Sequence, residues 1–169
     1  MLYKSFYNSP IGSLLLISNG TELTGLWIEQ QKHYGSQYEE QAQTQDDLEL
    51  FALVKKWLDC YFDGFAPDPS KIPLAPVGTP FQQAVWKILT NIPYGTTITY
   101  GCIAKQLAEL LQKKTMSAQA VGNAVGRNPI SIMIPCHRVI GTNGSLTGYA
   151  GGLDRKLWLL QHEGCLPQP

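Results

Sequence analysis

The sequence predicts an α/β protein of the α+β kind, in which a small antiparallel β-sheet domain with one helix precedes a mostly helical domain. The first 30 residues alternate short apolar runs with turn signals, as the strands of hairpins do. After residue 79 apolar residues recur at spacings of three and four, as in helices that pack on a core. Between them, residues 63–80 hold five prolines and two glycines, which favours a connector. We therefore expect domains at 1–78, linker included, and at 79–169.

Three strands and a helix are expected in the N-terminal domain. The strand-like segments are residues 3–7, 14–17 and 23–28. Asn19 and Gly20 form a strong hairpin signal between the second and third. Residues 33–45 are polar and predict a loop or a frayed helix. Residues 46–62 predict an amphipathic helix, because acidic residues open the segment and apolar residues follow at helical spacing: Leu48, Phe51, Val54, Leu58 and Tyr61.

The C-terminal domain is expected to begin with a capped helix. Thr79 suits the N-cap and Pro80 the first helical position. The buried face of this helix would be Phe81, Val85, Ile88 and Leu89. Residues 91–95 contain a proline and a glycine, so they should end the helix and turn the chain. The next helix should open at Thr99 or Tyr100, with an apolar face of Ile103, Ala104, Leu107, Leu110 and Leu111.

A short helix should then run from its cap, Ser117, to about Val125. We expect its core face to be Ala118, Val121 and Val125, which leaves outward Gln119, Gly122 and Asn123. Together with the preceding helix it could be a DNA-binding helix-turn-helix or an ordinary helical hairpin. Gly122 costs stability inside a helix, so either a ligand or another helix should approach its backbone closely.

The reactive candidate lies in the stretch from Ile132 to Val139. An apolar run ends at Pro135, which predicts a buried strand over Ile132–Ile134 with Cys136 presented at its end. A thiolate nucleophile needs such a place beside cationic groups. The alternative is a buried structural cysteine.

His137 is the candidate base for that thiol. Neighbours in an extended chain point to opposite faces, so Cys136 and His137 should communicate through a bridging water or a bend. A carboxylate from elsewhere should orient the imidazole, and Glu163, after the helix predicted at 154–162, is the candidate. Otherwise Glu163 is a solvated carboxylate at a helix end. Residues 147–152 are rich in glycine and predict a loop that faces a flat ligand.

Composition excludes several classes. Apolar content of 44% and charged content of 15% describe an ordinary globular protein, and no apolar run approaches the roughly 18 residues of a membrane span. The N-terminus lacks signal-peptide features, so we expect a cytoplasmic protein. The four scattered cysteines disfavour a zinc site or disulfides. The net charge is −5 over residues 1–78 and +5 over 79–169, a weak indication that the second half binds a polyanion.

Residues 135–139, Pro-Cys-His-Arg-Val, resemble the active-site signature of the 6-O-alkylguanine-DNA alkyltransferases, the methylated-DNA–protein-cysteine methyltransferases. Other blocks follow in that family's order, and they cover residues 79–164 closely. They are Thr-Pro-Phe-Gln-Gln-Ala-Val-Trp at 79–86, Ile-Pro-Tyr-Gly at 92–95, Thr-Tyr-Gly at 99–101, Ala-Val-Gly at 120–122, Arg-Asn-Pro at 127–129, Gly-Tyr-Ala-Gly-Gly at 148–152 and Trp-Leu-Leu-Gln-His-Glu-Gly at 158–164.

The resemblance implies a role for each part of the site. Cys136 would accept the alkyl group, and His137, held by Glu163, would take its proton through a water. Asn128 would brace the active-site turn, and Tyr100 would donate to the leaving base. The base pocket would be lined by Val139, Tyr149, Ala150 and Gly151. The contacts with DNA would come from Ser117, Gln119, Ala120, Gly122, Asn123 and Arg127.

The implied activity is direct-reversal DNA repair with 6-O-methylguanine as substrate, and acceptance of 4-O-methylthymine stays open. A monomer would bind double-stranded DNA by the minor groove and extrude the base, because the 6-oxygen lies inside the stack. No cofactor, metal or membrane is implied. A thioether has no good leaving group, so each molecule should react once.

One residue departs from the resemblance. Many members have an arginine before Ala-Val-Gly that fills the gap left by the flipped nucleotide, and here this position is Gln119. Glutamine lacks the charge and the stacking plane. Two other classes remain: a non-catalytic lesion binder, which the acceptor cysteine argues against, and a cysteine hydrolase, for which adjacent Cys and His are atypical.

Overall fold

The computed structural model describes residues 1–167, and its contacts divide them into two compact units. The first unit consists of Met1–Val77 together with the short segment Pro129–Ser131, and the second of Gly78–Asn128 and the chain from Ile132 onward. Within the described residues, no helix is long and apolar enough to cross a membrane.

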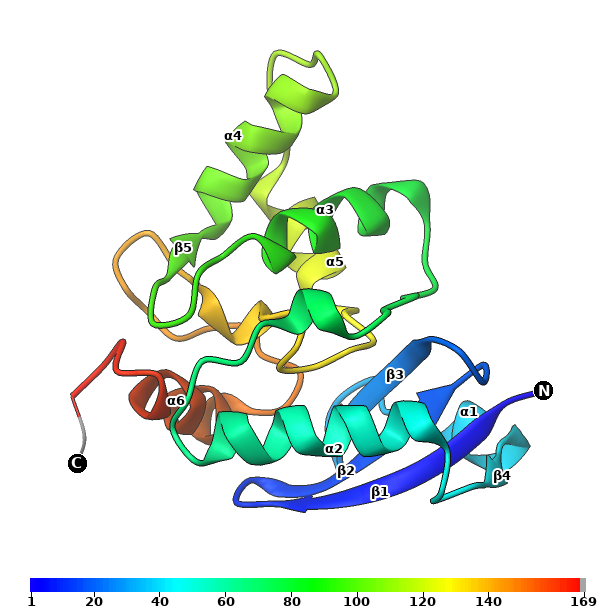
Figure 1. Cartoon of the computed structure of the whole chain (residues 1–169). Helices are drawn as coiled ribbons and strands as arrows, with labels where there is room; N and C mark the ends of the chain where they lie inside the picture. Colours follow the sequence, from blue (N-terminus) through cyan, green and yellow to red (C-terminus); the bar gives the residue numbers. More distant parts are fainter. Residues whose placement is uncertain (168–169) are drawn as a thin grey trace. The chain divides into compact units, whose positions relative to one another are not determined.

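A four-stranded sheet forms the first unit (Figure 1). Its strands are β1 (Tyr3–Ser9), β2 (Gly12–Ser18), β3 (Leu23–Ile28) and β4 (Gln43–Thr44), in the order β3-β2-β1-β4. The first three pair antiparallel, as the sequence predicts, whereas the two-residue β4 pairs parallel to β1. The predicted turn between β2 and β3 forms because the Asn19 side chain accepts from the N–H groups of Thr21 and Glu22.

Helix α2 (Glu49–Phe62) lies along this sheet (Figure 1). It begins three residues later than predicted, and the Asp46 carboxylate accepts from Ser5 of β1 rather than capping the helix. Its buried face is Leu50, Phe51, Val54, Trp57, Leu58 and Tyr61. The polar stretch before it contains a short helix, α1 (Ser36–Gln41), and a single 3₁₀ turn, η1 (Pro69–Lys71), lies in the proline-rich connector.

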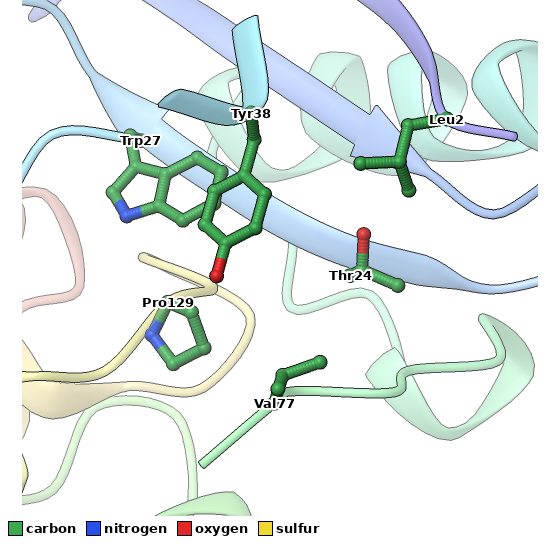
Figure 2. Close-up of a pocket in the computed structure, with 6 residues that line it drawn as sticks. All are labelled: Leu2, Thr24, Trp27, Tyr38, Val77 and Pro129. Carbon is green, nitrogen blue, oxygen red and sulfur yellow. The ribbon is translucent and has the colours of Figure 1, made fainter. Parts of the chain in front are cut away.

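The first unit also contains an apolar pocket of about 90 Å³ (Figure 2). It is lined by Leu2, Thr24, Trp27, Tyr38, Val77 and Pro129. The rings of Trp27 and Tyr38 stack with their centroids 5.6 Å apart. Pro129, more than fifty residues further along the chain, thus shares this pocket with residues of the sheet.

The second unit is mostly helical. Its elements are α3 (Pro80–Thr90), β5 (Ile98–Thr99), α4 (Tyr100–Leu110), α5 (Ala118–Gly126), η2 (Cys136–Arg138), β6 (Val139–Ile140) and α6 (Leu153–His162), and β5 pairs parallel to β6. The two predicted caps are confirmed: Thr79 forms a capping box with Gln82, and the Ser117 side chain accepts from the first turn of α5. Thr99, which was expected only near the start of its helix, caps α4 in the same way. These local hydrogen bonds fix where each helix starts.

The predicted core face of α5 is partly wrong. Val121 and Val125 are buried as expected, but Ala118 is exposed and Ala124 is buried instead. The Ala124 carbonyl accepts a 2.9 Å hydrogen bond from the indole N–H of Trp86 in α3. This long-range contact lies on the buried face of α5 and joins that helix to α3.

Candidate active site

Cys136 lies in a tight turn, and the strand predicted over Ile132–Ile134 is wrong. Ile132 has a left-handed backbone with φ of 71°. Pro135 has φ of −82° and ψ of 65°, and the Cys136 N–H donates to the Ile134 carbonyl at 2.8 Å, which makes an inverse γ-turn. Cys136 is then the first residue of η2. The apolar run reflects burial of this segment, which we call the active-site turn (Ile132–Arg138).

Asn128 braces the active-site turn. Its side-chain amide donates to the Ile134 carbonyl at 2.7 Å, and the whole residue is buried. A hydrogen bond between Asn128 and the Cys136 thiol also lowers the pKa of that thiol. One side chain therefore supports both the backbone of the turn and its sulfur, where a strand would have used ladder hydrogen bonds.

The Cys136 thiol is buried, with 5% of the residue exposed. Burial raises its pKa above the ordinary value, and the Asn128 hydrogen bond, the Lys156 charge and nearby backbone N–H groups oppose this rise. The net direction is upward, so the resting sulfur carries its proton at neutral pH. A nucleophilic reaction at Cys136 therefore needs a base.

His137 has the geometry and the protonation state of that base. Its Nε2 lies 2.7 Å from Oε1 of Glu163, and its Nδ1 has no hydrogen-bond partner within residues 1–167. Burial lowers its pKa, so the ring is neutral at pH 7. Nε2–H then donates to the carboxylate and Nδ1 is left as an acceptor. Because Cys136 and His137 lie in the 3₁₀ turn η2 rather than in an extended chain, the alternation expected for a strand does not apply to them.

Arg138 fixes the carboxylate, a role that sequence reasoning missed. Its Nε donates to Oε2 of Glu163 at 2.8 Å and its Nη2 to Oε1 at 2.9 Å, while Nη1 donates to the Ile92 carbonyl at 2.7 Å. Burial alone would raise the pKa of Glu163, but hydrogen bonds and charge hold it well below its usual range. His137 contributes first, through its hydrogen bond and through its charge at the low pH where this carboxyl titrates, and the Arg138 guanidinium contributes next. The signal available in the sequence was that Arg138 directly follows His137, the candidate base.

Lys156 is the second residue that the sequence did not reveal. It is fully buried in α6, and its Nζ donates to the carbonyls of Val139 and Thr147 and lies 6.0 Å from the centroid of the Tyr100 ring. Burial lowers its pKa from 10.5 to about 8, against the opposing effect of Cys136. The sequence did not indicate this burial, because a helical pattern places leucines inside and a lysine outside. In α6, Leu153 and Leu157 are exposed instead.

Lys156→Met should change how stability depends on pH. The folded-state pKa is below the unfolded one, so the wild type gains stability relative to the variant as pH rises from about 8 to 10.5, by on the order of 2–3 kcal/mol. Below pH 8 the difference should be constant. Urea unfolding of both proteins across this range measures it, and parallel curves between pH 8 and 10.5 would contradict the assignment.

Tyr100 joins the glycine-rich loop to this site. Its hydroxyl donates to the Thr147 carbonyl at 2.9 Å, and burial, with a smaller effect of Cys136, raises its pKa to about 12. Gly148 has φ of 76°, and a Cβ there would lie 3.1 Å from the Tyr100 hydroxyl, so glycine is required. The Tyr149 hydroxyl is buried without a hydrogen-bond partner among residues 1–167. Ala150 and Gly151 are half-buried beside it in the chain.

The residues predicted to contact DNA lie on the outer face of α5 and at its two ends. Ser117, Gln119, Asn123 and the following Arg127 are exposed, and Ala120 and Gly122 are half-buried. A Cβ at Gly122 would lie 3.9 Å from the Tyr100 ring, which is an ordinary contact. Close packing against another helix therefore does not explain this glycine. No group of three or more His, Cys, Asp or Glu side chains in residues 1–167 could hold a metal ion.

A buried thiol that a neutral imidazole follows in the chain, with a carboxylate and an arginine holding that imidazole in place, is typical of a protein that uses a cysteine as its nucleophile. Two family models cover nearly the whole chain: 6-O-methylguanine DNA methyltransferase, ribonuclease-like domain, at residues 2–76, and 6-O-methylguanine DNA methyltransferase, DNA binding domain, at residues 80–165. The chain belongs to the 6-O-methylguanine DNA methyltransferase family.

Known relatives agree with this family. A methylated-DNA–protein-cysteine methyltransferase of Haemophilus influenzae is 42% identical over 96% of this chain and 86% of its own length, and one of Methanosarcina acetivorans is 42% identical over 96% and 99%. The crystal structure of Mycobacterium tuberculosis OGT in complex with DNA matches with a TM-score of 0.83 and 40% identity, over 96% of this chain and 92% of that one.

Proposed function

We propose that this protein repairs DNA by direct reversal, and that it moves the alkyl group from the 6-oxygen of guanine to Sγ of Cys136. The observation that carries this proposal is the buried thiol of Cys136, which a neutral imidazole follows directly in the chain, with that imidazole held by Glu163. Family membership supports the reaction class, and the relatives named above are methylated-DNA–protein-cysteine methyltransferases.

Proton transfer precedes or accompanies the attack. Nδ1 of His137 accepts the thiol proton, directly or through a water, and the imidazolium that forms is stabilised by the ionised Glu163. The sulfur forms a bond to the alkyl carbon as the bond from that carbon to the 6-oxygen breaks. The electron pair of the broken bond stays with the 6-oxygen of the purine. Tyr100 donates a proton or hydrogen bond to the leaving base. Lys156 stabilises the thiolate through its charge.

The product explains why each molecule should act once. A thioether at Cys136 is stable in water, and none of the residues assigned to the site provides a nucleophile placed to cleave it. Restored guanine leaves, and the protein keeps the alkyl group. The alternative of a non-catalytic lesion binder is not favoured, because the acceptor cysteine and its base are both present.

DNA is the partner that the family and the DNA-bound relative support. We propose that α5 enters the minor groove with its outer face, where small side chains permit close approach. The extruded base would lie against Tyr100, Val139 and the loop from Tyr149 to Gly151. The Val139 carbonyl already accepts from Lys156, so a base would use its second lone pair. We propose that it acts as a monomer, and in the cytoplasm, where free thiols such as those of its four cysteines persist.

The direct test is the intact mass of the protein after incubation with a duplex that contains 6-O-methylguanine. We expect one added methyl group per protein molecule and no further addition when more DNA is supplied. An unchanged mass would contradict the proposal. Turnover of an ester or peptide without DNA would instead support the cysteine hydrolase.

Gln119→Arg should strengthen binding to the lesion duplex. The exposed side chain gains a charge and a stacking plane, a contact of about 1 kcal/mol, so the dissociation constant should fall roughly fivefold. The slope of log affinity against log salt should steepen by about one. Fluorescence anisotropy at several salt concentrations measures both. Gln83→Arg adds the same charge to α3 and is the control. If Gln83→Arg strengthens binding equally, Gln119 is not part of the DNA interface.

A further inference from the structure

The short segment Pro129–Ser131 is hydrogen-bonded to the edge of the first unit's sheet. The Leu26 N–H donates to the Pro129 carbonyl at 2.8 Å, and the Ser131 N–H donates to the Leu26 carbonyl at 2.9 Å. Leu26 and Ile130 form a parallel bridge. Because β3 is the edge strand of the sheet, these backbone groups of Leu26 are free to bind a further segment. The 129–131 segment is in effect a short added strand.

Side chains also seat this segment. Pro129 lines the apolar pocket together with Trp27 and Tyr38, as Figure 2 shows. Ser131 is buried, and its hydroxyl lies 3.4 Å from Oε1 of Gln31. The 129–131 segment therefore has both backbone and side-chain contacts inside the first unit.

The residues on either side of this segment belong to the second unit and to the active site. Asn128, immediately before it, braces the Ile134 carbonyl and the Cys136 thiol. Ile132, immediately after it, has φ of 71° although it is β-branched and only 1% exposed. Such a residue is a genuine outlier, and its conformation persists only where the surroundings hold it on both sides.

We propose that β3 of the first unit positions the alkyl acceptor by holding this segment. The Ser131 N–H bond to Leu26 fixes the chain on one side of Ile132, and the Asn128 bond to Ile134 fixes it on the other. Between these anchors Ile132 stays left-handed and the active-site turn presents Cys136. Leu26 is thus a positioning residue that acts through its backbone. This assignment rests on the proposed function, in which Cys136 is the acceptor.

A matched pair of proline substitutions tests it. Ser131→Pro removes the N–H that donates to Leu26, and Ala75→Pro removes the N–H that donates to the Leu23 carbonyl of the same strand at 2.8 Å. Ala75 lies far from the active-site turn in the sequence. Ser131→Ala keeps the N–H and removes only the hydroxyl, so it controls for that contact. If a proline variant does not fold, the peptide bond before residue 131 or 75 can be replaced by an ester bond. The ester removes the same N–H and adds no pyrrolidine ring.

We expect Ser131→Pro to lower the single-turnover rate of methyl transfer at saturating DNA about tenfold, the factor that one hydrogen bond can account for. Hydrogen exchange of the amides in residues 132–138 should accelerate by about the same factor. DNA affinity should not change. Ala75→Pro and Ser131→Ala should leave both the rate and the exchange of residues 132–138 within about twofold of wild type, whatever stability they lose.

The proposal is overturned if Ser131→Pro leaves both readouts as in wild type, or if Ala75→Pro changes them as much. Failure of the proposed function is a separate result: the wild type would then take up no methyl group. In that case hydrogen exchange of residues 132–138 still decides whether β3 holds the active-site turn.

Discussion

Cys136→Ser should take up no methyl group from 6-O-methylguanine DNA. The serine hydroxyl is smaller than the thiol and fits in the same space, so the buried turn and its Asn128 brace should persist. A hydroxyl is a much weaker acid than a thiol, and a neutral imidazole next to a carboxylate does not generate an alkoxide from it without further activation. Transfer should fall below detection in intact-mass measurements over the time in which the wild type reacts completely.

Cys102→Ser is the matched control for this loss. Cys102 is an exposed cysteine of α4 in the same unit, and its replacement should leave methyl uptake unchanged. The Cys136→Ser protein should still bind the lesion duplex, because the change does not touch the outer face of α5. A methyl group found on the Cys136→Ser protein, or on Cys60, Cys102 or Cys165 of the wild type, would contradict the assignment of the acceptor.

The features that the sequence predicted well are those set by local interactions. Thr79 and Ser117 cap their helices as expected, because an N-cap hydrogen bond reaches only two or three residues along the chain. Asn19 likewise forms its turn within four residues. The pairing of His137 with Glu163 was also anticipated, although 26 residues separate them, because a buried base needs a carboxylate to orient it.

The features that the sequence did not predict depend on contacts between distant residues. Nothing next to Ile132 indicates a positive φ, which arises where the chain passes from the sheet edge at Ser131 back to the active-site turn. Lys156 is buried because two carbonyls, at Val139 and Thr147, lie within reach of its amine. A helical pattern predicts the opposite, with the lysine outside. Such positions become visible only when the fold places their partners.

Glu163→Gln should slow methyl transfer by about 10²–10⁴-fold, which is the second largest effect that we expect. The amide oxygen can still accept from His137, but it carries no charge to stabilise the imidazolium that forms when the thiol loses its proton. The amide N–H₂ group would also face the Arg138 guanidinium, donor against donor, where the carboxylate now accepts two hydrogen bonds. Quenched-flow assays of single turnover, with DNA in excess, measure the rate.

The same substitution should destabilise the fold by about 3–5 kcal/mol at pH 7, because it leaves the buried charge of Arg138 without its partner. Glu163 has a folded-state pKa below its unfolded value of 4.5, so its contribution is complete above that pH and is lost as the pH falls below it. The stability gap between wild type and variant should therefore narrow on acidification.

Glu109→Gln, at an exposed carboxylate of α4, removes the same charge from the same unit and should change neither the rate nor the stability measurably. If the Glu163→Gln protein reacts as fast as the wild type, the carboxylate has no part in the proton transfer. His137 would then have to act as a base with no charged partner. The buried Arg138–Glu163 pair would be left with a structural role alone, as the anchor between the active-site turn and the end of α6.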